Sequence, residues 1–137
     1  MSDNDRDIIL AQWQTCVEMA NSISQRRDTM NNIFVTLNLA VVATIQYDVV
    51  KKSLPIMIIG ILFCLIWGFL IHHYKFLNSK KFEVINEMEK ELPSKPFSDE
   101  WTKLKKSRWY IDTSCYEYLL PTIFIIAHVC NIFIINS

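Results

Sequence analysis

The stretch LPIMIIGILFCLIWGFLI, residues 54–71, decides the fold of this chain. It contains no charged side chain, and its length is close to the ~20 residues that an α-helix needs to cross the hydrocarbon core of a bilayer. Side chains typical of a membrane–water boundary follow it directly, namely His72, His73, Tyr74 and Lys75. The sequence therefore predicts a transmembrane helix over residues 54–74.

A second apolar block lies at the end of the chain. Residues 119–135 are uncharged, and Tyr116 and Tyr118 precede them as aromatic side chains suited to the interface. We therefore expect a further span over residues 116–135.

A third and shorter block covers residues 33–47, and its apolar run is interrupted by Thr36, Asn38 and Thr44. It is long enough to span only if the polar residues at its ends reach into the interface. We expect this span over residues 31–50. The chain is thus predicted to be a single all-α membrane domain with three transmembrane helices.

The basic residues predict the orientation, because Lys and Arg are retained on the cytoplasmic side of a membrane. Three arginines precede the first predicted span and nine Lys or Arg lie between residues 75 and 108. Only Lys51 and Lys52 occupy the short turn, and the tail has none. We expect the N-terminus and the large loop in the cytoplasm and the C-terminus outside.

Two cytoplasmic helical parts are predicted. Residues 1–30 form an N-terminal amphipathic helix, and residues 75–114 form a rod that extends the second span, followed by a loop. The rod carries an apolar seam at steps of three and four residues, made of Leu77, Lys81, Ile85 and Met88. It cannot bury this seam alone, so either the N-terminal helix or a second copy of the rod covers it.

Several residue patterns suggest contact sites. Gly60, Cys64 and Gly68 recur at four-residue steps, as in helices that pack closely in membranes. A basic cluster precedes the last span, with Lys103, Lys105, Lys106 and Arg108. It is interpreted either as a site for anionic lipid headgroups or as a docking surface for a nucleotide or oligonucleotide ligand.

A polar ladder marks the first predicted span. Asn31 and Asn38 are seven residues apart, and Val35 and Val42 lie beside them on one helix face. In a ring of subunits this face could line a pore.

Common enzyme chemistry finds little support in this sequence. The chain has two glycines, too few for a phosphate-cradling loop, and its four cysteines form no CxxC pair. His72 and His73 are adjacent and diverge on a helix, so they do not share one metal. We expect no cofactor, no metal site and no enzymatic activity.

A set of residue types at fixed spacing extends over residues 26–124, and it includes Arg26, Arg27, Trp67, Tyr74, Asn78, Phe82, Glu87, Pro93, Pro96, Phe97, Glu100, Trp101, Leu104 and Pro121. In these residues the chain resembles the RipA family of small bacterial inner-membrane proteins. The resemblance implies a homo-oligomeric, octameric assembly in the inner membrane. Some similar proteins act as membrane effectors in phage-defence operons.

Two functional hypotheses follow. In the first, the oligomer is a channel or pore-type effector that a cytoplasmic ligand or partner protein controls. In the second, it is a non-conducting scaffold that recruits partner proteins on its cytoplasmic helices.

Overall fold

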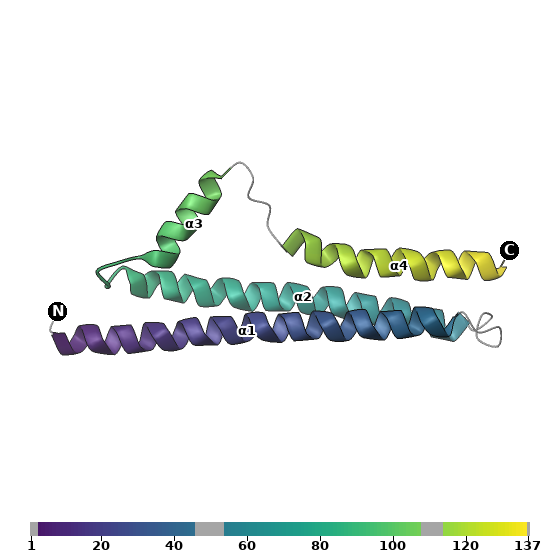
Figure 1. Cartoon of the computed structure of the whole chain (residues 1–137), viewed down its shortest axis with the longest axis horizontal. Helices are drawn as coiled ribbons and strands as arrows, with labels where there is room; N and C mark the ends of the chain where they lie inside the picture. The colour runs from purple at the N-terminus through teal and green to yellow at the C-terminus, as the bar shows by residue number, and fades with distance from the viewer. Residues whose placement is uncertain (1–2, 46–53, 108–113, 137) are drawn as a thin grey trace. The chain divides into compact units, whose positions relative to one another are not determined.

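The protein folds into four helices. The computed structural model describes residues 3–45, 54–107 and 114–136. Within them lie α1 (Asp3–Thr44), α2 (Leu54–Glu89), α3 (Pro96–Lys106) and α4 (Ser114–Asn136), and no strand occurs in these ranges (Figure 1). The predicted all-α fold is confirmed.

The helices contribute to two compact units. Unit 1 comprises Met1–Arg26 and Tyr74–Ile111, and unit 2 comprises Arg27–His73 and Asp112–Ser137. The helices α1 and α2 each contribute to both units, whereas α3 belongs to unit 1 and α4 to unit 2. The division falls where the chain changes from polar to apolar sequence.

Prolines and short turns set the ends of α2 and α3. Pro55 lies in the first turn of α2, where its missing N–H costs no helical hydrogen bond. The α-helix ends at Glu89, and three successive i→i−3 hydrogen bonds then tighten the chain as far as Leu92. α3 then starts at Pro96.

The core of unit 2 is aromatic at its centre. Trp67 is fully buried, and its ring stacks on Phe34 of α1 with centroids 5.8 Å apart and tilts against Phe124 of α4 at 6.3 Å. The three helices of this unit therefore meet around one indole.

Unit 1 has a smaller aromatic core. The ring of Phe97 from α3 lies 5.7 Å from that of Trp13 on α1 and 5.5 Å from that of Phe82 on α2. Ala20 and Ile85 are buried between α1 and α2 in the same unit. One phenylalanine thus fixes the first turn of α3 to the other two helices.

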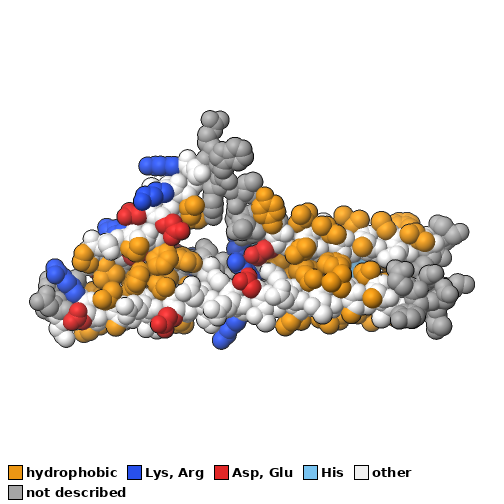
Figure 2. All heavy atoms as spheres, viewed as in Figure 1, with side chains coloured by type: hydrophobic (Ala, Val, Ile, Leu, Met, Phe, Trp, Pro, Cys, Tyr) orange, Lys and Arg blue, Asp and Glu red, His pale blue; other side chains and the backbone are white. Residues whose placement is uncertain are grey.

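Two of the three predicted spans are present among the described residues. α2 and the part of α4 from Tyr116 to Ile134 are long and apolar enough to cross a membrane. Figure 2 shows hydrophobic side chains along α4 and charged side chains over α3.

Two candidate spans are found among the described residues, whereas the sequence predicted three. The described part of segment 31–50, which ends at Ile45, is not among the candidate spans. The last part of the segment, residues 46–50, lies outside the described residues. Residues 3–30 of the predicted cytoplasmic helix and residues 31–44 of this block form one uninterrupted helix, α1.

Candidate functional site

Asn38 is the centre of a buried polar cluster in unit 2. Its side chain is fully buried. Its Oδ1 accepts a hydrogen bond from Cys64 Sγ at 3.1 Å and lies 3.2 Å from Nε2 of His128, while its Nδ2 donates to the Phe34 carbonyl at 2.9 Å. We call Asn38, Cys64 and His128 the polar centre. It joins α1, α2 and α4 through one amide group.

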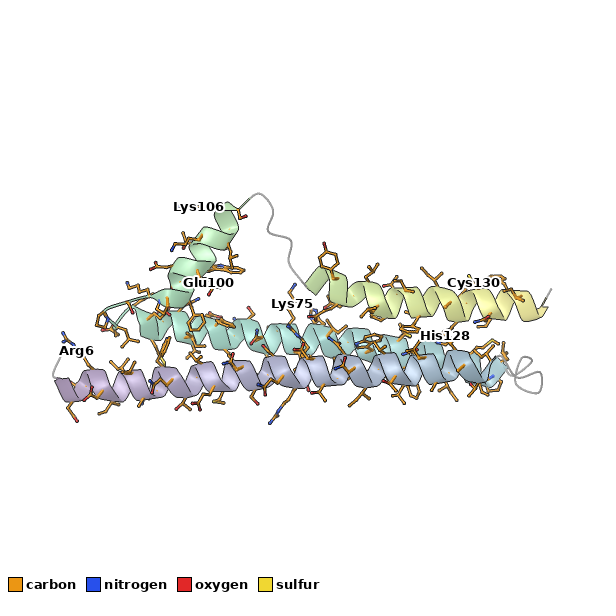
Figure 3. All side chains as sticks on the ribbon, in the orientation of Figure 1. Arg6, Lys75, Glu100, Lys106, His128 and Cys130 are labelled. Atoms are coloured by element: carbon orange, nitrogen blue, oxygen red, sulfur yellow. The ribbon has the colours of Figure 1, made fainter. Side chains whose placement is uncertain are left out.

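The His128 imidazole is held tightly in this centre. Because an amide oxygen only accepts hydrogen bonds, the geometry requires the proton on Nε2. The other ring nitrogen, Nδ1, is buried without a hydrogen-bond partner in the described structure. Figure 3 shows the His128 side chain between α4 and the other helices of unit 2.

Gly60 allows the imidazole to approach α2. A Cβ atom at this position would lie 2.5 Å from His128 Nε2 and 2.6 Å from Cε1. The predicted small-residue ridge is therefore divided: Gly60 and the buried Cys64 face neighbouring helices, whereas a Cβ at Gly68 would meet nothing within 4 Å.

A second polar contact lies about two helical turns before Asn38 on α1. Trp67 donates from its indole Nε1 to Asn31 Oδ1 at 2.8 Å. Asn31 and Asn38 therefore both face α2, and Val35 and Val42 on the same side are half-buried.

The pore-lining role of these four residues stays a prediction. The four residues share a face, but α2 and α4 of the same chain occupy that face at Asn38. For this face to line a conduit, α1 would have to separate from its two neighbours. In the packed state the face belongs to the interior of each copy.

An ion pair also connects α1 with α4. The Arg27 guanidinium lies 3.4 Å from a carboxylate oxygen of Glu117, and both side chains are about four-fifths buried. Glu117 is in the first turn of α4, where a negative charge is favourable beside the helix dipole.

The predicted oligomer seam is largely covered within the chain. Ile85 is fully buried in unit 1, and Lys81 Nζ lies 3.8 Å from Met19 Sδ of α1. Met88 is half-buried, and Leu77 is more exposed. Ile85 is therefore not available to a neighbouring copy, whereas Leu77 is still exposed and Lys81 contacts the N-terminal helix through Met19.

Glu89 is a structural residue that the sequence did not reveal. Its carboxylate is fully buried and accepts the backbone N–H groups of Phe97 and Ser98, each at 3.0 Å. The hydroxyl of Ser98 also donates to Asn86 Oδ1 at 3.3 Å. Glu89 thus caps the N-terminus of α3 from α2, in place of a local N-cap side chain.

The predicted basic cluster is only partly described. Lys103, Lys105 and Lys106 are exposed in the last turns of α3, and Lys105 Nζ lies 5.1 Å from the ring centroid of Trp101. Arg108 lies outside the described residues. A shallow hollow of about 430 Å³ runs beside this helix, and its described lining is Pro96, Asp99, Glu100, Lys103, Leu104 and Ser107. Two acidic residues in the lining do not favour an anionic ligand there.

The chemistry available to these groups is limited. Among the residues with described positions, no three His, Cys, Asp or Glu side chains are grouped so that they could hold a metal ion. The expectation that the chain is not an enzyme stays a prediction.

Long apolar helices that pack around a buried polar centre are typical of a small α-helical membrane protein. The profile of the octameric membrane protein family (8xMP) matches residues 10–136, and the chain belongs to this family. The predicted resemblance to a family of small oligomeric membrane proteins is thereby confirmed. The family name supports self-association of the chain. No curated protein and no solved structure matches it.

Proposed function

We propose that the chain forms a homo-oligomeric assembly in the bacterial inner membrane, and that a cytoplasmic ligand or partner acting on unit 1 opens a conduit through it. The observation that carries this proposal is the continuity of α1 and α2, each of which contributes to both units without interruption. A helix transmits rotation and translation along its axis, so a change at unit 1 moves side chains in unit 2. This coupling would suit a membrane effector, for example one that acts in phage defence.

The proposed topology has three crossings. Within unit 2, α1 lies along the span of α2 through the contacts of Asn38 with Cys64 and of Asn31 with Trp67. A bilayer around this part of α2 therefore also surrounds α1, whose polar side chains are satisfied by other helices and by its own backbone. Together with the distribution of basic residues, this supports a cytoplasmic N-terminus and an external C-terminus.

The polar centre supplies the proposed gate. Polar side chains inside a membrane are costly, and they commonly mark a functional path. In the packed state Asn38 Oδ1 is the partner of His128 Nε2 across helices. If α4 moves away, the same groups face the space between helices, where water can enter and hydrate them.

The experiment compares ion leakage from liposomes that contain purified Gly60→Ala or Gly68→Ala protein. We expect Gly60→Ala to leak K⁺ without any added ligand, because its Cβ displaces His128. Gly68→Ala is the matched control, since its Cβ meets open space. If Gly60→Ala liposomes retain K⁺ as well as the wild type while the protein is still oligomeric, the conduit proposal is wrong.

The alternative function is a non-conducting scaffold. The burial of the Asn31–Val42 face within each copy favours it, because a scaffold needs no polar surface in the bilayer. In that case Gly60→Ala and Gly68→Ala oligomers would both be impermeable, and substitutions on unit 1 would abolish the capture of partner proteins.

A further inference from the structure

The α1–α2 pair of unit 1 has two sides, and α3 packs on one of them. Phe97 of α3 contacts Trp13 and Phe82 there. Lys81 precedes Phe82 directly and so points about 100° away from it around the helix. Its contact with Met19 therefore lies on another side of the pair.

That side carries exposed apolar side chains. Leu77 and Val84 lie one helical turn before and after Lys81, so they share its face. Their exposed fractions are 37% and 47%, and Met19 is 46% exposed. We call Met19, Leu77, Lys81 and Val84 the open flank.

Lipid tails do not account for this exposure. The open flank belongs to the polar unit 1, whereas the uncharged run of α2 ends at Ile71. Apolar surface left in water costs about 25 cal/mol per Å², and contiguous exposed patches usually mark contacts with another protein.

Lys81 adds a charge requirement to this surface. Its ammonium lies against the Met19 sulfur, and it forms no ion pair with any carboxylate whose position is described. Its neighbour Lys80, by contrast, is paired with Glu83 at 2.6 Å. A partner that covers the flank should bring a carboxylate for Lys81.

The chain itself carries a surface with these properties. Glu100 and Leu104 are four residues apart on α3, so they share one face, and both line the hollow beside that helix. The cap by Glu89 and the ring of Phe97 fix the first turn of α3, before this face begins. Figure 3 shows Glu100 on α3.

We propose that the open flank binds α3 of a second copy of this chain. Leu104 of the second copy packs between Leu77 and Val84, and Glu100 of the second copy pairs with Lys81. The inference rests on the homo-oligomer proposed above and names the surfaces through which its copies meet. Because the two surfaces differ, the contact is heterologous, and its repetition can close a ring, which is compatible with the octamer in the family name.

A charge exchange tests this contact. Lys81→Glu and Glu100→Lys each place like charges opposite one another, and we expect each to weaken association at least about tenfold. The double variant restores the opposite charges and should restore the wild-type assembly. The readout is the mass of the purified protein in detergent, in multiples of the 16.1 kDa chain.

Lys80→Glu combined with Glu100→Lys is the matched control and should not restore assembly, because Lys80 pairs with Glu83 instead. A wild-type mass for both single variants would overturn the proposal and would leave α3 available for a lipid surface. Reduced mass in the singles without recovery in the double variant would also overturn it. This experiment measures mass and not conductance. An oligomer that assembles but does not conduct ions would therefore contradict the conduit proposal and leave the proposed contact unaffected.

Discussion

Gly60 gives the most direct test of the packing in unit 2. Carbon atoms in contact prefer separations of about 3.5–4.0 Å, but an added Cβ would lie 2.5, 2.6 and 2.9 Å from three atoms of the His128 ring. The ring cannot swing aside freely, because it is fully buried and bonded to Asn38. Either α4 moves by about 1 Å or the hydrogen bond breaks.

The expected cost follows from these two responses. Overpacking of this kind costs about 1–3 kcal/mol, and a lost hydrogen bond costs about 1 kcal/mol more. Alanine also stabilises a helix by about 1 kcal/mol relative to glycine. Gly68→Ala has that gain without the clash, so the comparison isolates the clash. We expect Gly60→Ala to be less stable than Gly68→Ala by about 2–4 kcal/mol.

Reversible unfolding in mixed micelles, with rising SDS fraction and circular dichroism as the signal, measures this difference. A Gly60→Ala/His128→Ala variant should recover the packing part of the loss, because the ring that the Cβ meets is gone. Equal stabilities of the two glycine variants would show that α4 does not pack on α2 through His128.

Three further substitutions test the other contacts. Asn38→Ala removes the acceptor at the polar centre and should lower the unfolding free energy by about 1–3 kcal/mol. The control Thr36→Ala removes an exposed hydroxyl and should change this free energy by less than about 0.5 kcal/mol. Equal effects of the two substitutions in the SDS titration would show that the polar centre does not stabilise the fold. Glu89→Ala leaves the first amides of α3 without their acceptor, so hydrogen exchange there should accelerate, while Glu83→Ala should leave it unchanged. Phe97→Ala should cost unit 1 about 2 kcal/mol, less than for a fully buried ring; an unchanged thermal midpoint would show that α3 is held by other contacts.

The helices themselves could be predicted from the sequence. The uncharged run of residues 54–71 and the interfacial side chains after it predict α2, and Pro93 indicates where that helix must already have ended. Helix α3 follows from Pro96 and the acidic Asp99 in its first turn. These signals are local, so they need no knowledge of neighbouring helices.

The candidate site could be predicted only as a helix face. Periodicity places Asn31 and Asn38 on one side of α1, but it does not say which surface packs there. The deciding partner of Asn38 is His128, ninety positions along the chain. Glu89 is a similar case. Like the exposed Glu83 and Glu87, it is a glutamate near the end of α2, and only the fold shows that it faces the start of α3.

Under the conduit proposal, the polar centre makes opening dependent on assembly. In hydrocarbon each unsatisfied polar group costs several kcal/mol, so a single copy in lipid gains nothing by separating α4 from Asn38. Copies that surround a common space can instead offer water to Asn38 and His128 when the helices part, and the cost then falls to that of the lost packing. A stimulus at unit 1 then has to supply only the free energy of the lost packing. The continuous helices α1 and α2 can transmit this stimulus to unit 2. Opening should therefore depend steeply on oligomerisation. If Lys81→Glu dissociates the oligomer, the combined Lys81→Glu/Gly60→Ala variant should not leak K⁺.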